Sequence, residues 1–182
     1  MIETERLVLR PWAEPDRAPY IAMMDDLEVS YWLGAAPDAK AADAAFDRML
    51  TFIAEHGPSQ FAIRRKVDEA FLGGVGLRRV PMEWRHPMSG HVEVGWRLAR
   101  AAWGGGYATE AAAAAMTWGF DAQETEVIHS WTARSNARSE AVMRRLGMSR
   151  AAHLDFDHPD LAADHPLRPH VVYLTERARN AL

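Results

Sequence analysis

The chain has 182 residues, of which 48% are hydrophobic and 25% charged, the usual balance of a globular domain with its own hydrophobic core. Its 21 basic and 25 acidic residues give a formal net charge of −4, which argues against nucleic-acid binding through bulk positive charge. The absence of cysteine excludes disulfides, thiol nucleophiles and cysteine zinc sites. Neither a signal peptide nor an apolar run of membrane-spanning length is visible. We therefore expect a single domain over residues 1–182, cytoplasmic, with no nucleic-acid or membrane partner.

The first part of the chain predicts a short strand, two helices and a pair of strands. Residues 6–10 alternate as in a strand, which Pro11 would end. Asp38 can cap the second helix, and Gly57 can end it. In order, we expect a strand at 6–10, helices at 14–26 and 39–55, antiparallel strands at 61–64 and 71–77, and a loop at 81–90.

The second part of the chain alternates strands with helices. Residues 91–98 and 127–131 have the pattern of strands, and the segment 107–120 between them is rich in strong helix formers. The remaining expected elements are a helix at 136–146, capped by Ser135-Asn136 and ended by Gly147, and strands at 148–156 and 171–175 around a polar loop at 157–169. The order β-α-α-β-β-β-α-β-α-β-β predicts a mixed α/β (α+β) fold. We expect a twisted, mostly antiparallel sheet of about seven strands, with helices on both faces and one βαβ crossover.

A run of glycines, Gly104-Gly105-Gly106, stands between the strand at 91–98 and the helix at 107–120. A helix start carries unpaired N–H groups and the positive end of the helix dipole, and glycines remove the Cβ atoms that would keep a ligand away. This pattern is typical of a phosphate or pyrophosphate site, and a simple tight turn is the alternative. The segment lacks the Gly-Lys-Ser/Thr of a P-loop and the third glycine of a dinucleotide fingerprint, so a nucleotide-binding domain is a weaker interpretation.

The element order and the glycine segment together resemble the GNAT superfamily of acetyl-CoA-dependent N-acetyltransferases. The family's coenzyme loop is usually Arg/Gln-x-x-Gly-x-Gly/Ala; Gly106 and Ala108 take the last two positions, and Trp103 departs from the first. Trp-Gly-x-Gly-Tyr-Ala-Thr-Glu-Ala resembles the loop of the RimJ/RimL-type branch. Three further motifs agree with that branch: the opening segment 3–11, the strand Glu93-Val94-Gly95-Trp96, and Asn136-x-x-Ser139 leading to Leu146-Gly147-Met148. The resemblance covers nearly the whole chain.

The resemblance implies a coenzyme site made largely of backbone. The pyrophosphate of acetyl-CoA would be held by the N–H groups of Gly104, Gly105, Gly106, Tyr107, Ala108 and Thr109. The pantetheine arm would pair with Trp96, Arg97 and Leu98, where this strand parts from the strand at 127–131, much as an added strand would. Asn136 would bond the arm, although a role as helix N-cap would compete for the same side chain.

Acetyl transfer from a thioester to an amine needs a neutral amine, a donor for the developing oxyanion and an acid for the departing thiolate. The expected oxyanion donor is a main-chain N–H near residues 95–97. Many family members place a tyrosine acid where this chain has Met143, so Ser139 is the remaining candidate acid, with a helix-start serine as its alternative role. Glu93 lies where several relatives carry the base, and partial burial would raise its pKa. Its alternatives are an exposed carboxylate or an ion pair with Arg97.

The primary interpretation is an N-acetyltransferase that moves the acetyl group of acetyl-CoA directly to a primary amine, with acetyl-CoA as co-substrate. The acceptor would be a protein N-terminus or a small-molecule amine, and the net charge slightly favours a cationic small molecule or a basic peptide. A non-catalytic acyl-CoA-binding sensor or interaction module is the alternative. The family resemblance also suggests a homodimer.

The walls of the acceptor site are expected to come from loops at 32–40, 81–90 and 157–169, with Trp32 and Trp84 as apolar walls. Arg100 would either add charge near the phosphates or lie solvated at the surface. The spacing of the C-terminal histidines matches no metal signature, so we expect scattered surface histidines and no metal cofactor. These histidines are His153, His158, His165 and His170.

Overall fold

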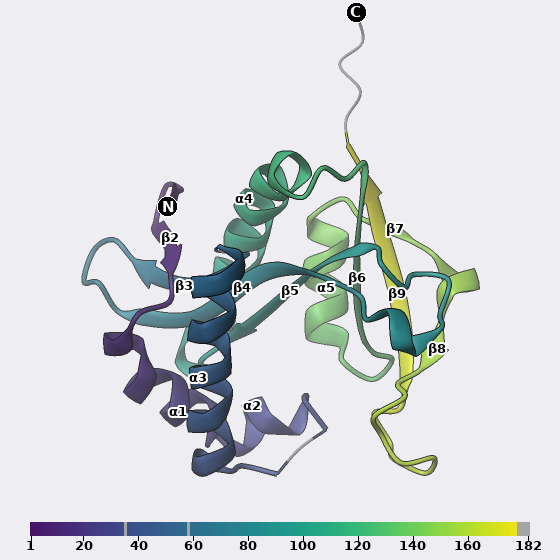
Figure 1. Ribbon diagram of the computed structural model, residues 1–182, viewed down its shortest axis with the longest axis horizontal. Helices are drawn as coiled ribbons and strands as arrows, with labels where there is room; N and C mark the ends of the chain where they lie inside the picture. The colour runs from purple at the N-terminus through teal and green to yellow at the C-terminus, as the bar shows by residue number, and fades with distance from the viewer. Residues whose placement is uncertain (35, 58, 178–182) are drawn as a thin grey trace, which may run out of the picture.

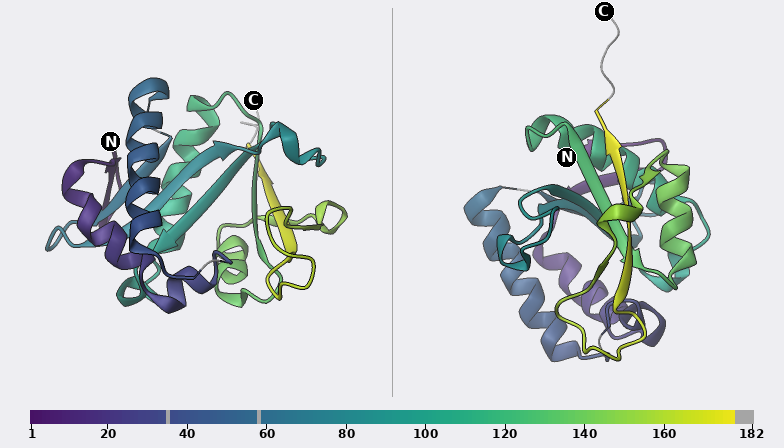
Figure 2. Two further views of the ribbon diagram at one scale, coloured as in Figure 1. Left: turned by 60° about the horizontal axis from the view of Figure 1, so that its bottom comes forward. Right: turned by 90° about the vertical axis from the view of Figure 1, so that its right-hand side faces the viewer.

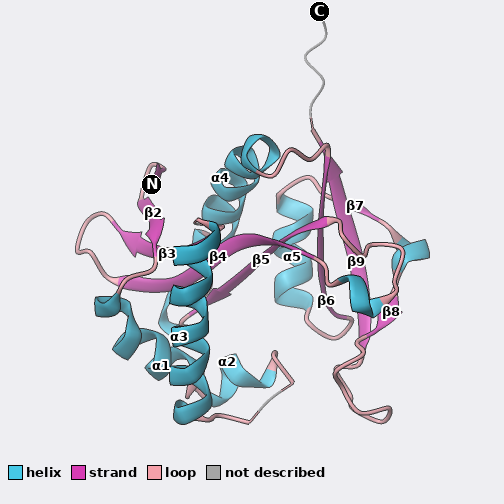
Figure 3. Ribbon diagram, in the orientation of Figure 1, coloured by secondary structure: helices cyan, strands magenta, loops and turns pink. Residues whose placement is uncertain are grey.

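The computed structural model of the protein describes residues 1–34, 36–57 and 59–177. Within these residues the strands form one mixed sheet in the order β1-β2-β3-β4-β5-β6-β9-β7, with β8 paired to β9 (Figures 1 and 3). The strands are β1 (Ile2–Glu3), β2 (Leu7–Pro11), β3 (Gln60–Arg65), β4 (Phe71–Arg79), β5 (Val92–Leu98), β6 (Val127–Ala133), β7 (Ser149–Arg150), β8 (Phe156–Asp157) and β9 (Pro169–Glu176). The helices are α1 (Arg17–Met24), α2 (Leu27–Tyr31), α3 (Ala39–His56), α4 (Tyr107–Ala122) and α5 (Ala137–Arg145).

Helices cover both faces of the sheet, as expected. Helices α1 and α3 pack on one face, and α4 packs on the other (Figure 2). The alternation of β3 shows why both faces need a cover: Phe61 and Ile63 join the core under α4, whereas Ala62 joins the core under α1 and α3. A strand with apolar side chains on both sides is stable only when each side is packed against another layer. The predicted mixed α/β fold is confirmed.

The alanine-rich helix α4 lies unusually close to the sheet. Ala111, Ala112 and Ala115 are fully buried, and a Cβ built on Gly119 would lie 2.3 Å from the Leu77 Cδ2 atom. Small side chains therefore let the helix backbone approach the sheet, which fixes the position of its N-terminus. Neither α4 nor any other helix in the described part of the chain has both the length and the apolar character to cross a bilayer.

The sheet opens between β5 and β6. These strands are parallel neighbours, but their register contains only Val92 opposite Ile128 and Glu93 opposite His129. Beyond that point β5 stays paired with β4 through Leu98, and β6 stays paired with β9 through Ala133. The two strands diverge in Figure 1. The remainder of each strand therefore has one edge without a neighbouring strand.

Two N-terminal predictions need correction. The expected helix at 14–26 is a 3-10 turn (Glu14–Asp16) followed by α1, and a separate helix, α2, comes next. The break occurs because Asp26 caps α2 by accepting a hydrogen bond from the Glu28 N–H, as Asp does at helix starts. The short strand β1 was also not expected; it adds to the edge of the sheet beside β2.

The expected strand at 148–156 is wrong. It is divided into β7, a 3-10 turn (Ala152–Leu154) and β8, and both short strands pair with β9. Asp155 explains the interruption: its Oδ1 atom accepts the Val172 N–H at 3.2 Å, and its Oδ2 atom binds Arg150 at 2.5 Å. A side chain thus takes a backbone donor of β9 that a continuous strand would have used. In the part of the chain that the structure describes, β1, β7 and β8 bring the sheet to nine strands rather than about seven.

Candidate active site

The glycine loop before α4 presents unpaired backbone donors. Gly104 and Gly106 have φ angles of +78° and +79°, the left-handed region that glycine adopts without steric cost. A Cβ on Gly104 would meet nothing within 4 Å, so the loop is open on that side. Within the described chain, no backbone N–H from residue 104 to residue 109 donates to a protein acceptor. Unpaired N–H groups at the positive end of a helix fit an anionic pyrophosphate.

Two N-terminal side chains anchor this loop. Arg6 donates from Nε to Glu110 Oε2 at 2.7 Å and from Nη1 to the Gly105 carbonyl at 3.0 Å. Its guanidinium also lies over the Tyr107 ring, 4.6 Å from the centroid. Thr4 donates its hydroxyl to Glu110 Oε1 at 2.5 Å. Burial is the largest single influence on the Glu110 carboxyl and would raise its pKa, but the hydrogen bonds from Thr4 and Arg6 together lower it. The opening motif of the sequence and the glycine motif therefore form one unit.

The edge of β5 that faces the gap can be derived from its ladder with β4. The Val80 N–H donates to the His91 carbonyl, and the Ala99 N–H donates to the Leu72 carbonyl. Because residues alternate along an antiparallel ladder, the odd-numbered residues of β5 bond to β4, and the peptide groups of Trp96 and Leu98 point toward the gap. The Leu98 carbonyl is already used by the Trp103 indole N–H at 2.9 Å. The Trp96 peptide group is thus suited to pair with an amide-bearing arm.

The start of α5 brings two predicted residues together. Asn136 is buried and accepts the Ser139 backbone N–H through Oδ1 at 3.1 Å. Capping uses this oxygen alone, and Nδ2 donates no hydrogen bond to the described residues, so the cap does not compete with a bond to a ligand. The Ser139 hydroxyl is half-buried and bonds no protein atom in the described ranges, unlike the backbone-bonded serine of the alternative role. Met143 is fully buried in the core.

Glu93 lies at the point where β5 and β6 separate. Its carboxylate is 6% exposed and pairs with the Arg78 guanidinium, which stands opposite it in the β4–β5 register. Burial raises the pKa of Glu93 to about 7, and the charge and hydrogen bond of Arg78 act against this rise. The ion pair therefore involves Arg78 and not Arg97, and the carboxylate is not exposed. Such a group changes its protonation state near neutral pH.

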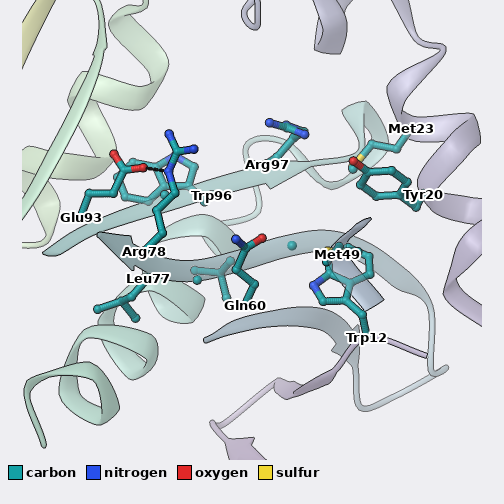
Figure 4. Close-up of a pocket in the computed structure, with 14 residues that line it drawn as sticks. Trp12, Tyr20, Met23, Met49, Gln60, Leu77, Arg78, Glu93, Trp96 and Arg97 are labelled. Carbon is teal, nitrogen blue, oxygen red and sulfur yellow. Dashed lines mark hydrogen bonds and ion pairs between the residues drawn. The ribbon is translucent and has the colours of Figure 1, made fainter. Parts of the chain in front are cut away.

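A pocket of about 230 Å³ opens on the α1 and α3 side of the sheet (Figure 4). Glu93, Gly95 and Arg97 line it from β5, because alternate residues of a strand share one face. Trp96 also lines the pocket, so the pocket reaches the gap where its peptide group points. The remaining lining residues are Trp12, Tyr20, Met23, Met49, Gln60, Gly74, Val75, Gly76, Leu77 and Arg78. Gly95 and Trp96 thus belong both to the lining of this pocket and to the part of β5 beyond its pairing with β6.

The loops from which walls of the acceptor site were expected do not line this pocket. None of the pocket residues comes from the loops at 32–40, 81–90 or 157–169. Trp32 packs edge-on against Tyr31, with ring centroids 5.0 Å apart. Trp84 packs against Phe156 and His158 at 5.9 and 5.0 Å. Sequence reasoning placed these tryptophans by their loops, whereas the pocket is built from strands and helices.

Other charged residues also lie differently from expectation. The Arg97 main chain bonds to β4 and is not free for the coenzyme arm, and its side chain lines the pocket (Figure 4). Arg100 pairs with Asp26 and Glu28, each at 3.1 Å. His170 is buried beside Phe156, so the C-terminal histidines are not all surface residues.

Comparison with known proteins agrees with this geometry. Residues 6–149 match the family described as acetyltransferase (GNAT) domain. The chain is similar to YoaA, an uncharacterized N-acetyltransferase of Bacillus subtilis (strain 168), with 22% identity over 153 residues, 82% of this chain and 83% of the relative. An acetyltransferase crystal structure from Agrobacterium tumefaciens str. C58 superposes with a TM-score of 0.74 at 27% identity, covering 97% of this chain and 94% of that one. A putative ribosomal-protein-serine acetyltransferase from Vibrio cholerae shares the fold, with a TM-score of 0.73, 16% identity and 97% of each chain covered.

The family match spans the glycine loop, both strands of the gap and the start of α5. It therefore includes every element that forms the coenzyme groove. The unpaired backbone donors of the loop and the free edge of β5 fit the pyrophosphate and the amide-bearing arm of a coenzyme A thioester. The chain belongs to the GNAT family and is an acetyl-CoA-dependent N-acetyltransferase.

Proposed function

We propose that the protein acetylates a small primary amine seated in the pocket under α1 and α3, with Glu93 as general base. The observation that carries this proposal is the position of Glu93, a buried carboxylate with a pKa near 7 where the pocket meets the groove. An amine must lose a proton to act as a nucleophile, since free amines are largely protonated at neutral pH. A base with a pKa close to the working pH is the most effective acceptor of that proton.

The Arg78 partner sets the working range of this base. Burial alone would push the pKa of Glu93 higher and leave the carboxyl protonated at neutral pH. Arg78 stabilises the ionised form and opposes that rise. Because the Arg78 side chain is 53% exposed, it can stay hydrated while it holds the carboxylate. Glu93 would receive the amine proton directly or through one water.

The groove residues would supply the other two requirements of the reaction. Acetyl-CoA provides the activated acetyl group, with its pyrophosphate on the N–H groups of residues 104–109. The Trp96 N–H points into the gap and would stabilise the oxygen on which negative charge develops. Ser139, whose hydroxyl bonds no protein atom in the described chain, would protonate the departing thiolate, and Asn136 Nδ2 would hold the arm.

The size of the pocket favours a small acceptor. A volume of about 230 Å³ is below the roughly 300–1,000 Å³ of sites for drug-sized ligands, so a metabolite-sized amine fits better than a peptide segment. The sequence motifs resemble the RimJ/RimL-type branch, which suggests a protein N-terminus as the other acceptor, and a ribosomal-protein-serine acetyltransferase shares the fold. At 16% identity that likeness carries the fold alone.

Thiol release from acetyl-CoA with a panel of small amines and N-terminal peptides tests the proposal. We expect turnover with small amines, and loss of that turnover in Glu93→Gln with coenzyme affinity unchanged. Turnover with peptides alone would overturn the small-molecule assignment. Tight coenzyme binding with no turnover on any amine would instead favour a sensor.

A further inference from the structure

The end of the pocket away from Glu93 holds polar donors that lack protein acceptors. Arg97 and Trp12 both line this pocket. Arg97 Nε and Trp12 Nε1 are buried nitrogen atoms, and neither has a hydrogen-bond partner among residues 1–34, 36–57 and 59–177. Buried donors are nearly always paired in folded proteins. Two such donors in one pocket therefore indicate a missing acceptor that a ligand would bring.

The guanidinium of Arg97 has no acidic neighbour to neutralise it. Its Nη1 atom contacts the Met24 sulfur at 3.3 Å, and no carboxylate of the described chain forms an ion pair with it. The carboxylate that shares the pocket, Glu93, is already paired with Arg78. The Tyr20 hydroxyl is the protein group that interacts with this guanidinium, and Nε has no protein partner in the described chain. Nε and the adjacent Nη2 form the edge of a guanidinium that binds a carboxylate through two parallel hydrogen bonds.

Trp12 provides the second donor from another part of the chain. The residue is 7% exposed and packs against Tyr20 and Phe46, with ring centroids 5.5 and 6.0 Å apart. This packing fixes the indole, whose nitrogen faces the pocket on the side of Gln60 (Figure 4). The Tyr20 hydroxyl lies near Arg97 in the same view. Donors from α1, from β5 and from Trp12, which directly follows β2, thus line the same pocket.

We propose that this end of the pocket binds a carboxylate of the acceptor, so that the substrate is a small primary amine that also carries a carboxylate. The inference rests on the proposed function, since it names the chemical class of the amine. With Glu93, Arg78 and Arg97 all ionised, the pocket carries one positive charge in excess. The pocket therefore favours an anionic group, opposite to the cationic acceptor that the net charge of −4 suggests.

The geometry also limits the length of the substrate. Glu93 and Arg97 are four positions apart on one strand, about 13 Å between their Cα atoms at the usual rise per residue. The reacting groups meet near Gly95 and Trp96, between these two side chains. An amine and a carboxylate a few bonds apart, as in α-, β- or γ-amino acids, suit this spacing better than a long polyamine.

Paired substrates give a direct test. We would measure kcat/KM for amino acids, for the corresponding amides, and for aminoalkyl phosphates of similar length. We expect the carboxylates to be preferred over their amides by roughly 10- to 100-fold, the usual effect of losing charge-assisted hydrogen bonds. Arg97→Met should remove this preference while changing kcat/KM for the amides by less than about threefold. Arg97→Lys should restore only part of it, because lysine cannot form the paired contact.

Two further variants complete the experiment. Trp12→Phe keeps the ring and removes the N–H, so it should weaken the carboxylate preference in the same direction and by less. Arg48→Met changes an exposed arginine on α3 and should leave both substrate classes unaffected. Acetylation of the amides shows that each variant is folded.

The outcomes separate the two levels of the proposal. Equal rates on amino acids and amides, or a preference for phosphates or for polyamines, would overturn the carboxylate site and leave the acetyltransferase intact. An Arg97→Met variant that keeps the carboxylate preference would do the same. Failure of the wild-type protein to release thiol with any amine would overturn both levels.

Discussion

The proposed coenzyme groove and the proposed acceptor pocket share strand β5 but are built in different ways. The groove consists of backbone groups: the N–H groups after Gly104, the peptide of Trp96 and a helix start. The pocket consists of residues from α1, α3, β3, β4 and β5 and of Trp12, which directly follows β2. A backbone site recognises what every acetyl-CoA molecule has in common, whereas a side-chain site can change its specificity one residue at a time. This division lets one fold keep its coenzyme while the acceptor differs.

The glycine loop should show the largest effect on the groove. Gly106→Glu would place a carboxylate on the expected pyrophosphate seat and should weaken coenzyme binding at least ~100-fold, or about 2.7 kcal/mol. Gly147→Glu is the control, because Gly147 also has a left-handed φ, of +73°, and a Cβ there would meet nothing within 4 Å. Calorimetry with acetyl-CoA measures both variants. Equal affinities for the two would remove the loop from the site.

Glu93→Gln should give the largest effect at the junction of groove and pocket. Loss of a general base typically lowers the rate by ~10²–10⁴-fold. In the wild type, kcat/KM should rise with pH through about 7 as Glu93 ionises, and this limb should disappear in the variant while the limb of the amine itself remains. A wild-type limb near pH 7 that persists in Glu93→Gln would assign the base elsewhere.

The same substitution should change stability with a defined sign. The folded-state pKa of Glu93 is raised above its model value of 4.5, so the protonated form favours the folded protein. That contribution is fully present below pH 4.5 and is lost as pH rises through about 7. Glu93→Gln should therefore raise Tm relative to the wild type more at pH 8 than at pH 5. A larger gain at pH 5 would contradict the direction of the pKa shift.

Ser139→Ala should act on turnover and not on folding. The Asn136 side chain caps α5 and accepts the backbone N–H of residue 139, which alanine also has. We expect kcat to fall by roughly 100-fold, the low end of acid–base effects, with coenzyme affinity and Tm within error. Unchanged kcat would leave Ser139 as a helix-start residue only.

Arg6→Gln should have the smallest effect on the groove. The substitution removes the ion pair with Glu110 and the bond to the Gly105 carbonyl, so the loop becomes less ordered without losing its N–H groups. We expect coenzyme affinity to fall by about fivefold, since a partly exposed ion pair contributes about 1 kcal/mol or less. A double-mutant cycle with Glu110→Gln measures the coupling, which would be zero if the pair has no effect.

The sequence predicted the glycine turn and the starts of α4 and α5 because these signals are local. Gly104 to Gly106 stand beside the helix that they precede, and Asn136 stands three residues before Ser139. The start of a helix and its caps depend on neighbouring residues. The division of the 148–156 segment was missed because it depends on the side chain of Asp155 reaching β9.

The pocket was missed because its contacts join distant parts of the chain. Arg78 reaches Glu93 only through the β4–β5 register. The predicted strand stopped at residue 77, one residue before Arg78. Trp12 and Tyr20 lie more than seventy residues before β5 in the chain, with no motif to connect them. The anchor of the glycine loop was missed for the same reason, because Arg6 and Glu110 are 104 positions apart. The signal available in the sequence was that residues 93, 95 and 97 share one face of the strand and that 93 and 97 are charged.

Amide hydrogen exchange with and without acetyl-CoA tests most directly that backbone donors hold the coenzyme. Exchange reports the opening of individual hydrogen-bonded amides, so each N–H of the groove is observed separately. We predict that acetyl-CoA slows exchange at residues 104–109 and at Trp96, while the odd-numbered residues of β5, already bonded to β4, change little. Protection elsewhere in the chain with these amides unaffected would contradict the assignment of the groove.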